Sequence, residues 1–404
     1  MIKLLHLADI HLGMENYGRT DPKTGLNSRL LDFLKSFDSA VDYAKENKID
    51  LVLFAGDAFK TRHPSPTEQR EFAKRIKKLA LAGIPVVLLV GNHDIPNATG
   101  KANTLDIYHT LEIDNVYVLS KPKVLKLDLK NNEKIQIAAL PWISKSILAS
   151  KEDYKKKTIS EIHEQMSSRL IRIIERLIQQ IDTSLSCIFM AHTTVAGAEF
   201  GSEHKVYVGS DVLLPLSVFA RQPFNYVALG HIHKYQILNE NPPVVYSGSI
   251  DRVDFSEEKE DKGFVYLEIN NKKVEYKFVP VPARRFLTIN IKINENDQDP
   301  TEKCIQEIKR YKIDNAVVRV QIKIPDFLVE KLHENEIRRK LKKAHFIAAI
   351  NREIIQQKRE KRDLSYLDRL SVLDILEEYL KSKGVEKKRR LKLREYAQKL
   401  IQEK

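Results

Sequence analysis

Residues 85 to 95 read PVVLLVGNHDI, an apolar run that ends abruptly in Gly91-Asn92-His93-Asp94. The apolar residues are consecutive rather than alternating, which is typical of a strand buried on both faces. Gly and Asn are the commonest turn residues, and Gly91 is placed to let the chain bend sharply after Val90. Taken alone, the tetrapeptide is explained equally well as a simple turn or as part of a functional site.

Four other apolar runs end in the same way, each at a side chain that can bind a metal. The runs cover residues 2–8, 51–55, 187–191 and 226–229, and they lead into Asp9-Ile10-His11, Gly56-Asp57, His192 and Gly230-His231-Ile232-His233. Amphipathic helical patterns separate the early runs, at 30–44 and 67–81. Strand and helix in alternation predict an α/β core, in which side chains just past the strand ends converge at one edge of the sheet. Turn formation alone does not explain five apolar runs that each end at a potential metal ligand.

The residues at these strand ends supply carboxylate, imidazole and amide groups. They are Asp9, His11, Asp57, Asn92, His93, Asp94, His192, His231 and His233. This donor set suits manganese, iron, zinc or magnesium rather than metals that prefer thiolates. Two ions are expected, because the residues outnumber the ligands of a single ion. A two-metal site about 3.5–4 Å across needs an anionic bridge, and Asp57 is our candidate.

In this order, the five blocks resemble the motifs of the calcineurin-like metallophosphoesterases, over roughly residues 1 to 280. The longer stretches LADIHLG, GDAFKTRHPSP, VGNHD, ALPW, LGHIHK and YSGSIDR are similar to the SbcD-type nucleases, bacterial relatives of the catalytic subunit of the double-strand-break repair complex. The resemblance implies an α/β fold with a four-layer β-sandwich flanked by helices. A small α/β capping domain and a C-terminal helical pair would follow it.

The resemblance also assigns roles to the site residues. One ion would bind Asp9, His11, Asp57 and His233, and the other Asp57, Asn92, His192 and His231. His93 matches the family's catalytic His, which protonates the departing oxygen and is not a metal ligand, and Asp94 matches the carboxylate that orients it. Two cations generate the nucleophile at neutral pH, neutralise the phosphate and hold the attack in line. We expect the two divalent ions to be manganese.

One position departs from many relatives in this nuclease group, which have a His three residues after the bridging Asp. Here that position is Lys60, and His63 follows three residues later. A Lys can bind phosphate as a point charge, so Lys60, with His63, is a candidate contact for the substrate phosphate. A solvated loop Lys explains the same residue equally well.

The positive charge of the chain is concentrated in its C-terminal part. Of the net charge of +13, residues 284–404 carry +11, from 31 Lys and Arg against 20 Asp and Glu. This suits an electrostatic contact with a polyanion, although solvated helix faces carry Lys and Arg too. The two cysteines, Cys187 and Cys304, lack CxxC spacing and fit a reducing compartment. Without a long apolar run, we expect a cytoplasmic, nucleoid-associated protein with no membrane span or signal peptide.

Pattern and resemblance divide the 404 residues into a nuclease domain at 1–283, a capping domain at 284–350 that steers DNA, a polar linker at 351–363 and a helical pair at 364–404. Gly384 is placed to end the first helix of the pair. The two apolar stripes consist of Leu367, Leu370, Leu373, Leu376 and Leu380, and of Leu393, Tyr396, Ala397, Leu400 and Ile401. Such a pair either packs back on its own chain or needs a partner. Resemblance favours docking on the coiled-coil base of an SbcC-type ATPase.

The sequence therefore predicts a two-metal-dependent DNA nuclease that acts with an SbcC-type ATPase in DNA end processing and double-strand-break repair. It would be a 3'-5' exonuclease on double-stranded ends and an endonuclease on single strands and hairpins. Resemblance also suggests a homodimer built from the helices near 30–44 and 67–81. The alternatives are a nucleotidase or cyclic-nucleotide phosphodiesterase of the same fold and, from another class, a non-catalytic DNA-end adapter.

Several other residues with suitable chemistry are expected to be structural. His6 lies inside the first strand, Trp142 follows Pro141, and residues 246–249 read as a turn. The remaining histidines without ligand spacing are His109, His163, His204, His333 and His345.

Overall fold

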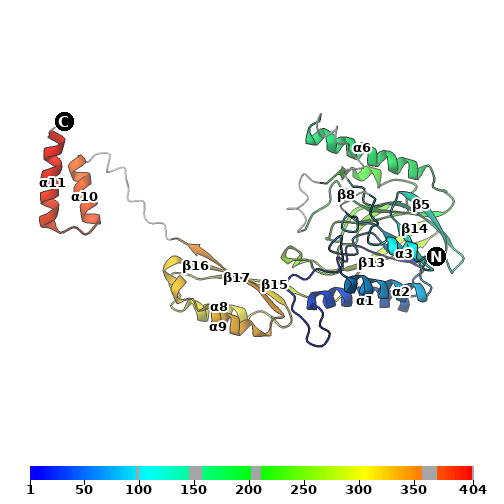
Figure 1. Ribbon diagram of the computed structural model, residues 1–404, viewed down its shortest axis with the longest axis horizontal. Helices are drawn as coiled ribbons and strands as arrows, with labels where there is room; N and C mark the ends of the chain where they lie inside the picture. Colours follow the sequence, from blue (N-terminus) through cyan, green and yellow to red (C-terminus); the bar gives the residue numbers. More distant parts are fainter. Residues whose placement is uncertain (97–99, 145–156, 202–210, 357–370, 403–404) are drawn as a thin grey trace.

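Two six-stranded sheets form the core of the larger unit of the molecule, on the right in Figure 1. The first has the order β14-β13-β1-β2-β3-β4, with bounds Lys273–Pro280, Gly263–Asn270, Ile2–Leu7, Leu51–Phe54, Val86–Leu89 and Val116–Leu119. The second has the order β11-β12-β10-β7-β6-β5, with bounds Gln236–Glu240, Pro243–Tyr246, Tyr226–Gly230, Ser186–His192, Lys134–Leu140 and Lys123–Asp128. The computed structural model describes residues 1–96, 100–144, 157–201, 211–356 and 371–402.

The sheets and helices make four layers. Side chains from both sheets, among them Leu53, Val87, Ile188 and Ala228, share one buried core between the sheets. Helices α1 (Ser28–Glu46) and α2 (Pro66–Leu81) pack on the outer face of the first sheet, and α6 (Ile159–Ile178) packs on that of the second. The expected four-layer α/β sandwich is confirmed.

Continuous apolar runs became the parallel strands at the centre of each sheet. β1, β2, β3 and β4 run parallel in the first sheet, and β6, β7, β10 and β12 in the second. Every residue of β2 and β3 is buried, as expected for strands covered on both faces. The shorter elements are α3 (Asp106–Thr110), β8 (Thr194–Val195), β9 (Leu213–Leu214) and the 3-10 turns η1 (Leu216–Val218) and η2 (Phe255–Glu257).

A small unit, residues 286–355, follows the sandwich. Its parallel strands β15 (Phe286–Lys292), β16 (Val317–Pro325) and β17 (Phe346–Ile355) form one sheet, whose apolar face packs on helices α8 (Pro300–Lys309) and α9 (Glu334–Lys340). The turns η3 (Asp326–Lys331) and η4 (Leu341–Lys343) complete it.

The prediction of a linker from residue 351 is wrong for its first five residues. Asn351 pairs with Gln321, and the pairing of β17 with β16 continues to Ile355. Polar side chains are compatible with a strand here because residues 351–355, in an edge strand, are exposed on both faces, and the backbone pairing does not depend on them. Residues 357–363 lie outside the described residues.

Helices α10 (Val372–Ser382) and α11 (Lys387–Gln402) form a pair that lies apart from the rest of the chain in Figure 1. Gly384 has φ +70° just past the C-cap of α10, so it ends that helix as expected. An ion pair between Arg394 and Asp374 joins the two helices. Leu367 and Leu370 of the predicted stripe lie outside the described residues. Within the described residues, no helix is long and apolar enough to cross a membrane.

Candidate metal centre

The five polar blocks meet at the carboxyl ends of strands from both sheets. Asp9 and His11 follow β1, Asp57 follows β2, and Asn92 follows β3. The blocks after β7 and β10 come from the second sheet and supply His192, His231 and His233. The sequence led us to expect one edge of one sheet, whereas the site is built where two sheets meet.

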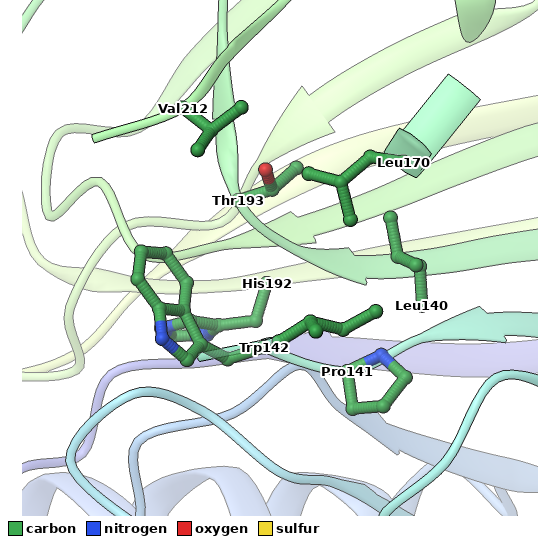
Figure 2. Close-up of a pocket in the computed structure, with 8 residues that line it drawn as sticks. Leu140, Pro141, Trp142, Leu170, His192, Thr193 and Val212 are labelled. Carbon is green, nitrogen blue, oxygen red and sulfur yellow. The ribbon is translucent and has the colours of Figure 1, made fainter. Parts of the chain in front are cut away.

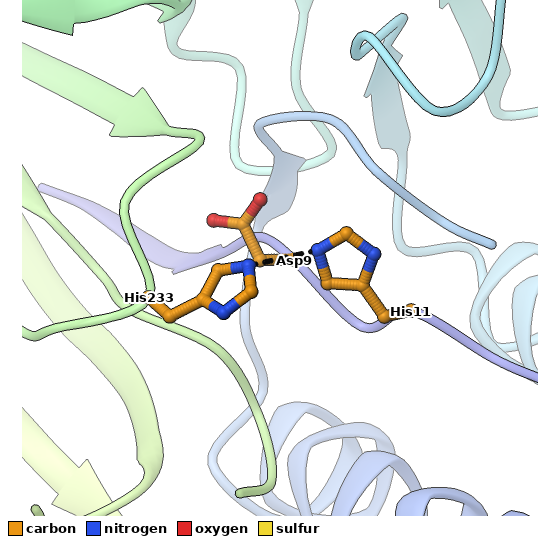
Figure 3. Close-up of side chains that lie close together, drawn as sticks. All are labelled: Asp9, His11 and His233. Atoms are coloured by element: carbon orange, nitrogen blue, oxygen red, sulfur yellow. Dashed lines mark hydrogen bonds between the residues drawn. The ribbon is translucent and has the colours of Figure 1, made fainter. Parts of the chain in front are cut away.

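The first group of potential ligands consists of Asp9, His11 and His233, whose candidate ligand atoms lie within 4.8 Å of one another (Figure 3). The Nε2 atoms of the two imidazoles are 2.9 Å apart. The Oδ2 atom of Asp57 lies 3.7 Å from the Nε2 atom of His11. All four side chains are buried.

The second group gathers around Asn92. Its Oδ1 atom lies 2.9 Å from the Nε2 atom of His192 and 3.1 Å from the Nδ1 atom of His231. The Oδ2 atom of Asp57 lies 3.4 Å from the same Nε2 atom of His192. Asp57 therefore borders both groups, which is the arrangement that a bridging ligand requires.

In both His192 and His231, the ring nitrogen that faces away from Asn92 is bound to an oxygen acceptor. Nδ1 of His192 donates to the carbonyl of Ala55 at 2.7 Å, which leaves Nε2 with its lone pair toward the site. Nε2 of His231 donates to the Asp211 carboxylate at 2.7 Å, which leaves Nδ1 in the same role. Asp211 was not predicted as a site residue, because it lies outside every motif.

His233 is held in the same way by a buried carboxylate. Its Nδ1 donates to Glu257 at 3.0 Å, and the ammonium of Lys262 lies 2.9 Å from the other oxygen of Glu257. Burial opposes charge on Glu257, but Lys262 and His233 hold its pKa at about 2, so the carboxylate is charged. Glu257 could not be predicted from a motif, because the contact joins residues 24 positions apart.

The residues present fit two divalent ions. Two carboxylates, four imidazoles and an amide oxygen converge, and Asp9 and Asp57 are no more than 2% exposed. Burial raises the pKa of Asp9 to about 6, and buried carboxylates of this kind are stable as anions when a cation lies beside them. Hard and intermediate ions such as manganese, iron, zinc and magnesium prefer this oxygen and nitrogen set.

The backbone at the site is strained. Positive φ values, which residues other than glycine rarely adopt, occur at four site residues. These are 51° at Asp9, 48° at His11, 59° at Asp57 and 102° at His231. Gly91 does not adopt such a value, but the expected turn is present, because the backbone N–H of Asp94 donates to the carbonyl of Gly91 at 3.3 Å. A Cβ atom on Gly91 would overlap the carboxylate and the backbone nitrogen of Asp57, so this position is glycine because Asp57 packs directly against it.

His93 reaches the cluster, but Asp94 does not orient it. The His93 ring lies edge-on to that of His11, with centroids 5.0 Å apart, and its Nδ1 donates to the carbonyl of Lys60 at 2.7 Å. The carboxylate of Asp94 instead accepts from the backbone N–H groups of Gly91 and Asp57, at 2.9 and 3.0 Å. Asp94 therefore ties together the two loops that carry the ligands, and the Lys60 carbonyl holds His93.

The two candidate phosphate contacts differ. Lys60 is half-buried, and its ammonium is close enough to help lower the pKa of His93, which burial lowers most. His63 is exposed in the loop before α2, and no contact of the described residues joins it to the cluster. The site thus includes Lys60 and leaves His63 at its margin.

Trp142 forms one wall of the site (Figure 2). Its indole lies 5.0 Å from the ring of His231 and 6.2 Å from that of His192, and its backbone N–H donates to the carbonyl of Val90. A cavity of about 20 Å³ lies behind it, lined by apolar side chains that include Leu140. Trp142 packs as expected, but against metal-site histidines, which the sequence did not indicate.

The other histidines that the structure describes are outside the cluster. His6 accepts from the Tyr226 hydroxyl through Nδ1 and donates to the Leu229 carbonyl through Nε2. His345 bonds to Ser28, His109 is exposed, and His204 lies outside the described residues. The hydroxyl of Tyr246 donates to the carbonyl of Thr193, and the backbone N–H of Ser249 donates to that of His233 at 3.0 Å, so the 246–249 turn supports the site.

A four-layer α/β sandwich with a buried Asp and His cluster at its strand ends defines a metal-dependent hydrolase. The family model for calcineurin-like phosphoesterases matches residues 2–235, and the chain belongs to this family. A dimetal phosphatase from Danio rerio is 10% identical, with 69% of this chain and 96% of that chain covered and a TM-score of 0.41. GAP50, the anchor in the inner membrane complex of Plasmodium, is 13% identical, with coverage of 69% and 84% and a TM-score of 0.35. Neither likeness is strong enough to indicate a substrate.

Proposed function

We propose that this protein is a two-metal, manganese-dependent DNA nuclease, with 3'-5' exonuclease activity on double-stranded ends and endonuclease activity on single strands and hairpins. The observation that carries the proposal is the docking of the small unit beside the metal centre. Glu258 accepts hydrogen bonds from Thr288 of the small unit, one residue after the Glu257 that holds His233. Residues 284–356 carry a net charge of +5, from 16 Lys and Arg against 11 Asp and Glu, so a basic unit lies next to a phosphoesterase site, which suits a polyanionic substrate.

The residues of the chain support cleavage of a phosphodiester. When bound, the two ions would supply a hydroxide nucleophile at neutral pH and neutralise the phosphate. His93 is held through Nδ1 by the Lys60 carbonyl, so its Nε2 is the nitrogen that can donate a proton to the departing oxygen. The Lys60 ammonium contacts a phosphate oxygen as a point charge.

The nuclease proposal is tested by cleavage of end-labelled hairpin and linear DNA, with manganese or magnesium. We expect cleavage of both DNAs and little turnover of mononucleotides or cyclic nucleotides. Asp57→Asn and His192→Asn should lose cleavage, whereas the exposed control His109→Asn should keep it. Faster turnover of a mononucleotide than of DNA would assign a nucleotidase instead. Metal-loaded protein that binds DNA ends without cutting them would indicate the non-catalytic adapter. Cleavage by the double variant Asp57→Asn, His192→Asn would refute the two-metal assignment.

We further propose that α10 and α11 dock on an SbcC-type ATPase. The pair exposes many large apolar side chains for its size: Val372, Ile375, Tyr379, Leu391, Leu393, Tyr396, Leu400 and Ile401. Exposed apolar surface of this extent marks an interaction site. Leu373, Leu376 and Leu380 of the expected stripe are less exposed than these, so a partner would meet a different face of α10.

Deleting residues 364 to 404 tests the docking. The truncated protein should retain basal nuclease activity and fail to co-purify with the ATPase, whereas the double variant Val372→Ser, Tyr379→Ser should weaken co-purification without loss of helix content. Unchanged co-purification after the deletion would refute the docking role. The expected homodimer, built from α1 and α2, is tested by sedimentation of the same truncated protein. The dimer should persist after the deletion, because these helices are retained.

A further inference from the structure

One short segment lies between the metal centre and the small unit. Residues 252 to 258, which we call the docking turn, include η2 (Phe255–Glu257) and lead toward β13. Successive side chains of this turn contact opposite neighbours. Glu257 faces the metal site, and Phe255 and Glu258 face the small unit.

On the metal side, Glu257 is fixed from several directions. Its Oε1 accepts from Nδ1 of His233, and its Oε2 accepts from the backbone N–H of Val253 at 2.9 Å and from Lys262. The Lys262 ammonium also donates to the carbonyl of His233, at 3.0 Å. Glu257 and Lys262 are almost fully buried, so neither can move without displacing its neighbours.

On the other side, the docking turn contacts three residues of the small unit, Phe286, Thr288 and Arg319. The ring centroids of Phe255 and Phe286 are 5.0 Å apart. The Arg319 guanidinium lies over the Phe255 ring, 4.3 Å from the centroid of that ring. The Glu258 carboxylate accepts from the backbone N–H of Thr288 at 2.8 Å and from its hydroxyl at 2.6 Å. Phe286 and Thr288, both near the start of β15, therefore contact this one turn of backbone, and Phe286 also packs against Tyr17 and Arg29 of the sandwich.

We propose that the docking turn couples the two regions, so that the affinity of the metal position containing His233 depends on how the small unit is seated, with Glu257 as the positioning residue. A shift of β15 moves Phe255 and Glu258, and a turn this short passes the shift to Glu257. The aim of the His233 ring then changes. Coupling is reciprocal, so metal binding should in turn hold the small unit in place.

The test is manganese titration of the metal-free full-length protein by calorimetry, without DNA. Glu257→Gln should weaken one of the two manganese sites by about 10- to 100-fold and leave the other unchanged. Thr288→Val and Glu258→Gln should weaken the same site by about 5-fold or more. The control Lys323→Gln, at the other end of the same small sheet, should leave both sites as in the parent protein.

A double variant identifies the route. If the effect passes through Glu257, adding Thr288→Val to Glu257→Gln should cause no further weakening. Additive weakening, or unchanged manganese affinity in both Thr288→Val and Glu258→Gln, would overturn the proposal.

Hydrogen exchange gives a reading that does not depend on variants of the small unit. Manganese should slow amide exchange in β15 of the parent protein, and this slowing should be lost in Glu257→Gln. As a control, the exchange rates in α6 should be equal in the parent protein and the variant. Equal slowing of β15 in the two proteins would contradict the coupling. The proposal rests on the metal centre and not on the DNA substrate, so either can fail while the other stands.

Discussion

His93 illustrates how one residue can be assigned two chemical roles from its surroundings. It forms a group with His11 and Asp57 whose candidate ligand atoms lie within 4.8 Å of one another, so geometry alone would let it bind a metal. Its Nδ1 is engaged with the Lys60 carbonyl, which leaves a single nitrogen for either role. The motif indicates a proton donor.

Replacing His93 with Leu separates these roles. We expect the variant to keep both ions and to lose about 100- to 10,000-fold in turnover, the usual contribution of a general acid. Manganese stoichiometry and the cleavage rate are measured on the same sample, beside His109→Leu. A variant that binds one ion fewer would reassign His93 as a ligand.

Trp142 should act through the histidines it covers. Trp142→Ala removes the flat surface against His231 and His192, so we expect manganese affinity to fall by about 10-fold. Trp142→Phe retains an aromatic wall and should restore most of the affinity. Binding is measured without substrate, and equal affinity in the Ala and Phe variants would show that the ring has no positioning role.

At this scale the sequence indicated which residues gather but not what each one contacts. Asp57 and His192 could be found because each follows an apolar strand, and parallel strand ends meet in space. Glu257, Asp211 and Trp142 could not, since their contacts join parts of the chain that only the folded structure brings together. The role of Asp94 was misassigned for the same reason, because the donors to its carboxylate include backbone N–H groups of a loop 36 and 37 residues away.

Among the secondary-structure elements, β1 and β10 are joined across the two sheets by His6. Its ring bonds Tyr226 and Leu229 as a neutral imidazole, and burial lowers its pKa to about 3. The unfolded chain binds a proton near pH 6.5, whereas the folded protein does not until far lower pH. This contribution to stability is therefore complete above pH 6.5 and is lost as the pH falls toward 3.

A comparison with His6→Gln measures this effect. Between pH 6.5 and 5, the parent protein should lose about 2 kcal/mol of unfolding free energy that the variant does not lose. Urea unfolding of both proteins in chelator gives the difference. Parallel pH profiles would show that His6 is not the group responsible.

Elements were predicted best where burial made their pattern unambiguous. The strands with continuous apolar runs, such as β2 and β3, appear where the sequence indicated them. The end of β17 was missed because residues 351–355 are exposed on both faces, so hydrophobicity carries no signal there and only the pairing with β16 defines the strand.

For the molecule as a whole, metal binding should stabilise the sandwich, because the ligands come from both sheets. An ion that binds only the folded protein adds about 2.7 kcal/mol when its free concentration is 100 times Kd. We expect manganese to raise the melting temperature of the metal-free parent, and Asp57→Asn to abolish most of that increase. A shift of equal size in the variant would place the stabilising ion elsewhere.

The order of the strands also has a consequence during synthesis. β1 lies between β2 and β13, so during synthesis one edge of β1 stays unpaired until residue 270 has left the ribosome. Asp9 likewise waits for His233 before its site is complete. Until those residues are made, an apolar strand edge and two acidic ligands are present without their partners. An unpaired edge of this kind favours aggregation of the nascent chain, and the first metal position is complete only once His233 has been made.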